Sequence, residues 1–197
     1  MKKNIEAFIQ HVKSECKKHK IKLVMRNVSY LKLSDGIRCS GYFDEEERVL
    51  AVAMKKDMWL GVLVHEYAHL TQWLENCEAW RKGCKGLPKV DEWLTGKKVR
   101  GIKQALAYSR NLELDNEKRS VKLIKKWKLP IDIKDYVKRA NAYVQFYNYL
   151  YYSKKWCRPN NSPYDNKSIV DSMPTTFRMN YETMSDKYKQ LYKQENK

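Results

Sequence analysis

The segment VLVHEYAHL, residues 62–70, decides the fold of this 197-residue chain. The residues that flank its two histidines and its glutamate are uncharged, which is typical of a buried helix rather than a solvated one. On an α-helix His65 and His69 are separated by about 400° of rotation and roughly 6 Å of rise, so their imidazoles project from one face. Two imidazoles placed in this way can bind one metal ion.

Glu66 lies about 100° from His65 and about 60° from His69 around the same helix, beside the metal rather than on it. There it can take a proton from a metal-bound water. Zinc fits this arrangement, because it accepts imidazole, tolerates an open position and lowers the pKa of bound water to about 7. The pattern predicts Zn²⁺ as cofactor and Glu66 as catalytic base. Two surface histidines beside an ordinary glutamate are the alternative, which the uncharged flanks disfavour.

The third ligand is expected to be a carboxylate. The other histidines, His11 and His19, both lie in a lysine-rich N-terminal segment, and none follows His69. The metzincin pattern fails, because Gln72 and Glu75 stand where its glycine and third histidine would be.

A long helix expected over residues 99–126 offers two acids. If Leu106 faces the core, steps of 7 and 11 residues reach Glu113 and Glu117 on the same apolar stripe. Two acids on such a stripe indicate metal ligands, or else acids paired with a basic residue such as Arg110. The residues themselves leave both interpretations open.

This order of motifs resembles the gluzincins, in which HExxH is followed on a later helix by a glutamate ligand and then by a second acid. The resemblance covers residues 21–127 and implies a zincin-like fold, Glu113 as third ligand and Glu117 as support for a ligand histidine. Gluzincins often have aspartate at the second acid, where this chain has glutamate. The resemblance also implies that the strand expected at 48–54 is an edge to which a substrate peptide adds. Residues 113–127 and 136–156 are similar to uncharacterised metallopeptidase-like proteins of tailed phages.

The periodicity predicts an α+β fold with a small antiparallel or mixed sheet of about three strands. We expect strands at 21–30, 38–43 and 48–54, the last two joined as a hairpin. The sheet would pack on helices at 3–18 and 57–75, the second capped by Asp57, and on the glutamate helix.

Residues 76–89 predict a loop, because Gly83, Gly86 and Pro88 interrupt the pattern, and a short helix is expected at 91–95. A tyrosine-rich helix follows at 132–152. We expect one zincin-like metallopeptidase domain over residues 1–155. Residues 156–197 would form a C-terminal arm, with a weak helical pattern at 181–192 and disorder at its end.

The composition of the chain indicates the cellular compartment in which we expect the protein. Its five cysteines are odd in number and widely spaced, and its first residues, MKKNIEAFIQ, lack the apolar run of a signal peptide. No apolar stretch reaches the roughly 18 residues that span a bilayer. We therefore expect a cytoplasmic protein without a membrane partner, in the host cytoplasm if it comes from a phage.

The formal net charge of +17 would attract nucleic acid, although no nucleic-acid-binding motif is recognisable. A solvated basic surface explains the charge equally well, so both interpretations stay open.

The function expected from these features is hydrolysis of peptide bonds in a protein or peptide substrate, with restricted specificity. An oxyanion donor is also needed, and Tyr143, Tyr147 and Arg139 are candidates by chemistry alone, with ordinary packing as the alternative for the tyrosines. The competing hypothesis is a basic virion structural or nucleic-acid-associated protein with a structural or vestigial zinc site. Glu66 favours catalysis, because a structural site needs no general base.

Overall fold

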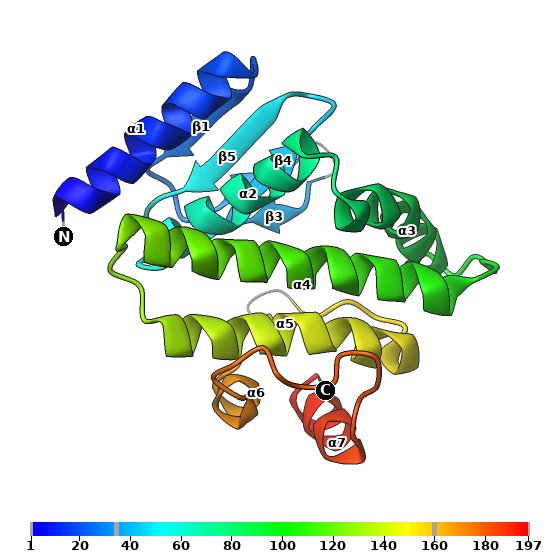
Figure 1. Cartoon of the computed structure of the whole chain (residues 1–197). Coiled ribbons are helices and arrows are strands. Elements are labelled where there is room, and N and C mark those ends of the chain that lie inside the picture. Colours follow the sequence, from blue (N-terminus) through cyan, green and yellow to red (C-terminus); the bar gives the residue numbers. More distant parts are fainter. Residues whose placement is uncertain (1, 34–35, 159–160, 197) are drawn as a thin grey trace. The chain divides into compact units, whose positions relative to one another are not determined.

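The computed structural model describes residues 2–33, 36–158 and 161–196 and has the mixed α+β composition that the sequence predicts (Figure 1). The chain forms two compact units. The first comprises Met1–Glu75 with Arg119–Ile131, and the second Asn76–Lys118 with Asp132–Lys197. The boundary between residues 155 and 156 that we expect from the sequence stays a prediction.

The first unit contains a mixed three-stranded sheet in the order β1-β5-β4. Its strands are β1 (Lys22–Arg26), β4 (Gly41–Asp44) and β5 (Val49–Ala53). β1 runs parallel to β5, and β4 forms the expected antiparallel hairpin with β5, with Phe43 opposite Leu50. A separate antiparallel pair joins β2 (Leu31–Lys32) to β3 (Arg38–Cys39).

The expectation that the strand at 48–54 is a sheet edge is wrong. β5 is the central strand, with ladder partners on both sides. Its run Leu50–Ala53 is buried throughout, as befits a strand that is covered on both faces. Among the described residues, β4 ends this sheet on one side and β1 on the other.

Helices α1 (Lys2–Lys18) and α2 (Trp59–Leu74) pack on the sheet of the first unit (Figure 1). Phe8 and His11 of α1 contact the ring of Tyr67 on α2, with ring centroids 5.9 and 5.6 Å apart. Contrary to expectation, Asp57 does not cap α2, whose N-cap is Met58. The amide of Trp59 donates to the carbonyl of Lys56, which leaves Asp57 in the turn that precedes the helix.

The second unit begins with α3 (Glu78–Leu94), a continuous helix where the sequence predicts a loop and a short helix. The two glycines that suggested the loop are buried against α4 (Ile102–Trp127). A Cβ atom at Gly83 would lie 2.5 Å from Leu112 Cδ2, and one at Gly86 would lie 2.7 Å from the Ala105 carbonyl oxygen. These glycines therefore permit close helix packing and do not end the helix.

Helix α5 (Ile133–Ser153) forms the centre of the second unit, with α6 (Lys167–Ser172) and α7 (Asp186–Glu195) packed on it (Figure 1). Asp132 caps α5 by accepting hydrogen bonds from the amides of Lys134 and Asp135. Tyr192 of α7 is fully buried, and its hydroxyl donates to the Ala142 carbonyl. Residue 197, where we expect disorder, lies outside the described residues.

None of the helices in the described parts of the chain combines the length and the apolar composition needed to cross a membrane.

Candidate metal centre

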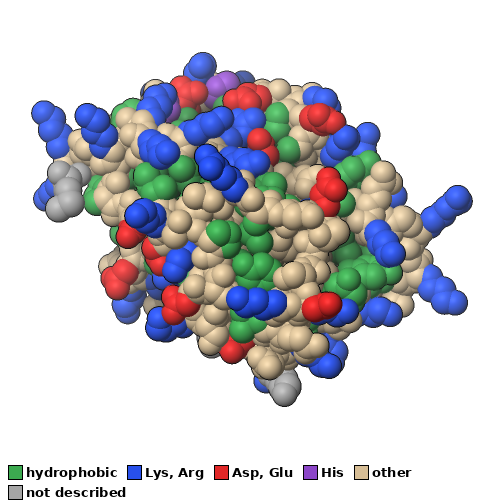
Figure 2. Space-filling view, turned by 60° about the horizontal axis from the view of Figure 1, so that its bottom comes forward, with side chains coloured by type: hydrophobic (Ala, Val, Ile, Leu, Met, Phe, Trp, Pro, Cys, Tyr) green, Lys and Arg blue, Asp and Glu red, His purple; other side chains and the backbone are tan. Residues whose placement is uncertain are grey.

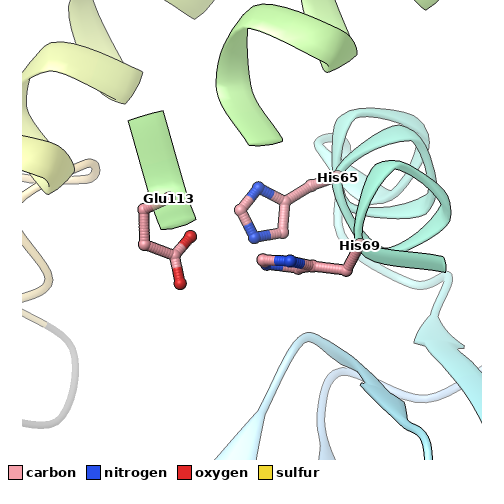
Figure 3. Close-up of side chains that lie close together, drawn as sticks. All are labelled: His65, His69 and Glu113. Carbon is pink, nitrogen blue, oxygen red and sulfur yellow. The ribbon is translucent and has the colours of Figure 1, made fainter. Parts of the chain in front are cut away.

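The two histidines of the HExxH motif lie one turn apart on α2 and point the same way (Figure 3). Their ring centroids are 4.8 Å apart and their planes are nearly perpendicular. Both are half-buried. Leu63, Ala68 and Leu70 have no exposed surface and anchor α2 in the core, which fixes the direction of the histidine face.

Glu113 of α4 completes a group of three donors with these histidines (Figure 3). One ligand atom from each of His65, His69 and Glu113 lies within 4.8 Å of the other two. The carboxylate is buried, with 7 % of the residue exposed. The group that the sequence singled out can therefore hold a metal ion.

The donor set suits a small divalent cation. Ligand atoms bound at about 2.0–2.2 Å in a tetrahedral site are roughly 3.4 Å from one another. Side-chain rotations can bring donors within 4.8 Å to that spacing.

One further side chain, Gln72 on α2, contacts this group of three donors, and the sequence analysis did not predict this contact. Nδ1 of His69 lies 2.9 Å from Oε1 of Gln72, which is completely buried. In the sequence, Gln72 is noted only because it occupies a position that the metzincin pattern reserves for glycine. The sequence signal for this contact was the spacing of three residues between Gln72 and His69. Residues three apart lie on neighbouring turns of one helix face.

Glu66 is buried on α2, with 8 % of the residue exposed, and faces strand β4 at Gly41. A Cβ atom at position 41 would lie 3.1 Å from Glu66 Cγ and 2.5 Å from Val62 Cγ1. The strand can approach the predicted general base this closely because residue 41 has no side chain. Sequence reasoning passed over Gly41, although a glycine inside a strand often marks a close approach.

Glu117 lies one turn after Glu113 on α4 and is also buried, with 5 % of the residue exposed. Its predicted role, a hydrogen bond to a ligand histidine, stays a prediction.

The tyrosine candidates for oxyanion binding lie together on α5. The hydroxyl oxygens of Tyr143 and Tyr147 are 3.3 Å apart. Burial raises the pKa of both phenols, and the negative charge of Glu113 raises each further. Both tyrosines therefore keep their protons at neutral pH and can donate hydrogen bonds near Glu113.

The third candidate, Arg139, has hydrogen-bond partners of its own within the second unit. Its Nε donates to Asp135 Oδ2 at 2.7 Å, and its Nη1 donates to the Tyr164 carbonyl at 2.9 Å. These bonds engage the guanidinium, so the tyrosine pair is the better candidate for an oxyanion donor.

The basic residues are dispersed. On the face shown in Figure 2, Lys and Arg side chains are spread among acidic and apolar ones and do not gather in one stripe. This distribution agrees with a solvated basic surface and gives no location for a nucleic-acid groove on that face.

Comparisons with protein-family models, with curated proteins and with solved structures find no match. The likeness to gluzincins therefore stays a prediction from the sequence. Any functional assignment rests on the side chains described above.

Proposed function

We propose that this protein is a zinc-dependent peptidase of the gluzincin type. His65, His69 and Glu113 would be the zinc ligands, and Glu66 the general base. The observation that carries the proposal is the convergence of two histidines and one buried glutamate within 4.8 Å. Two imidazoles and one carboxylate form the ligand set of well-characterised zinc peptidases.

When bound, zinc supplies Lewis acidity that polarises a carbonyl group and lowers the pKa of water to about 7. Glu66 then accepts a proton from the attacking water at a carboxylate oxygen. It returns that proton to the nitrogen of the departing amine, so one carboxylate serves as base and then as acid. Its position next to His65 in the sequence and its burial on α2 support this role.

The edge strand β4 is the best surface for an extended substrate. β5 is paired on both sides, so a peptide cannot add to it. Backbone hydrogen bonds to a free strand edge would align a peptide without regard to most of its side chains. Because Gly41 of β4 lies against Glu66, a peptide on this edge would pass close to the general base.

The Tyr143 and Tyr147 hydroxyls are the proposed donors to the oxyanion. Their raised pKa values keep them protonated at neutral pH, as a donor must be. Removal of one such donor typically costs about 10²–10³-fold in turnover, so Tyr143→Phe and Tyr147→Phe should lower turnover without loss of metal.

Metal removal tests the proposal. The purified protein is analysed for bound metal and then incubated with a library of peptides before and after chelation. We expect cleavage that chelation abolishes and that added Zn²⁺ restores, with one to a few preferred sequences. Loss of metal without any change in cleavage would contradict the proposal, because cleavage would then come from another source.

The second candidate function is a basic virion structural or nucleic-acid-associated protein in which a zinc ion joins two helices. The net charge of +17 favours it. It predicts bound zinc without cleavage of any peptide, and binding to DNA or RNA that weakens steeply with salt.

We also propose a cytoplasmic location, in the host cytoplasm if the chain is of phage origin. All five cysteines are free thiols, which is the usual state in a reducing compartment.

A further inference from the structure

Gln72 presents an unusual combination of chemistry and burial. It is a polar side chain with no exposed surface, on the last turn of α2. Burial of an amide costs free energy unless its atoms are hydrogen-bonded. Its Oε1 meets this requirement through Nδ1 of His69, at 2.9 Å.

This bond determines which nitrogen of His69 carries the proton. An amide oxygen only accepts hydrogen bonds, so Nδ1 must carry the proton. A neutral imidazole has one N–H group, and the lone pair is then on Nε2. Nε2 is therefore the nitrogen that can bind a metal ion.

We infer that Gln72 is a positioning residue that fixes His69 in the Nδ1–H tautomer, with the lone pair on Nε2, before any metal arrives. The inference rests on the proposed zinc site for its functional meaning. Both partners belong to α2 and lie three residues apart, so one helix brings them together. A hydrogen bond of this kind also holds the plane of the ring and strengthens its donation to a metal.

An amide differs from the carboxylates that often support metal-binding histidines, because it accepts a hydrogen bond without a charge. The bond to Gln72 therefore orients His69 without adding a charge next to the ring.

The direct test is the tautomer of His69 in the metal-free protein. Long-range ¹H–¹⁵N correlation spectra distinguish the two neutral tautomers, and loss of one of four histidine signals in His69→Ala assigns the resonance. We expect the Nδ1–H form in the wild type and a shift toward the other form in Gln72→Leu. An Nε2–H tautomer in the wild type would overturn the inference.

Zinc affinity gives the second readout, measured by competition with a chelator of known affinity. Gln72→Leu should bind zinc about 10–100-fold more weakly, the usual effect of removing such a partner. Gln72→Glu keeps an acceptor for Nδ1–H and should restore affinity to the wild-type range. Equal zinc affinity in the wild type and Gln72→Leu would overturn the inference.

Gln145→Leu is the matched control for the loss of a buried amide. Gln145 is also almost fully buried, but it lies on α5 and donates to the Asn180 carbonyl. Its replacement should lower the melting temperature without any change in zinc affinity. A loss of zinc equal to that of Gln72→Leu would show a general effect of destabilisation and contradict a specific role for Gln72.

The two proposals fail in different ways. If the wild-type protein binds no zinc, the proposed function fails, while the tautomer of metal-free His69 still decides what Gln72 does. If the wild type binds zinc and hydrolyses peptides but Gln72→Leu matches it in tautomer and affinity, only the inference about Gln72 fails.

Discussion

Gly41 on β4 lies against Glu66 on α2, so closely that a Cβ atom at position 41 would be 3.1 Å from Glu66 Cγ. The same added atom would be 2.5 Å from Val62 Cγ1, nearer than two carbon atoms can approach. The predicted general base and the proposed peptide-binding edge are thus in contact at a residue that cannot be enlarged unless Val62, Glu66 or the backbone shifts.

Gly41→Ala should therefore destabilise the protein by about 1–3 kcal/mol, the usual range for overpacking. It should lower peptide hydrolysis more than zinc content, because it displaces Glu66 or β4 rather than the ligands. Urea denaturation, metal analysis and turnover measure the three effects. The double variant Gly41→Ala/Val62→Ala removes the closest contact and should recover part of the stability, and no recovery would contradict this account of the site.

The two acids of α4 should differ in their effects. Glu113→Ala removes a proposed ligand, so zinc should be largely lost and the melting temperature should fall, since metal binding is coupled to folding. Glu117→Ala should cost about 10–100-fold in metal affinity or activity. Asp115→Ala on the same helix is the control and should retain zinc, because Asp115 Oδ2 accepts from Cys77 Sγ. Full zinc in Glu113→Ala with loss in Glu117→Ala would place the ligand one turn later.

His11 should make the stability of the first unit depend on pH. Burial lowers its pKa from 6.5, and Lys126 lowers it further, against an opposing effect of Glu15. The unfolded chain then takes up the proton more readily than the folded one. Stability from neutral His11 is fully present above about pH 6.5 and is lost as the pH falls from there toward the lowered pKa.

His11→Gln tests this prediction, because an amide can still bond the Tyr67 hydroxyl, which lies 2.9 Å from His11 Nε2. The free energy of unfolding, measured in urea at about pH 7.5 and 5.5, should fall more in the wild type than in the variant. The same pH dependence in both proteins would exclude His11 as its source.

The histidine helix could be predicted because its evidence is local. Spacing alone places His65 and His69 on one face, and the apolar neighbours indicate burial. The long helix with Glu113 could be predicted equally well, since its apolar stripe continues over several turns. Both acids of that stripe are indeed buried.

Two of the errors concern features that depend on distant parts of the chain. Gly83 and Gly86 resemble helix breakers until their contacts with Leu112 and Ala105 are known. The edge position expected for the strand at 48–54 came from the likeness to gluzincins, whereas β5 is the central strand because β1 and β4 pair with it on either side. Gln72 was recognisable only by its spacing from His69, which many helical pairs share.

A comparison of wild type with Glu66→Gln tests the central claim most directly. The amide nearly matches the carboxylate in shape but cannot accept the proton of the attacking water. We predict unchanged zinc content and melting temperature, with peptide hydrolysis reduced by at least about 10²-fold. Glu75→Gln, which alters an exposed glutamate paired with Arg119, should leave all three unchanged. Undiminished hydrolysis by Glu66→Gln would contradict the account.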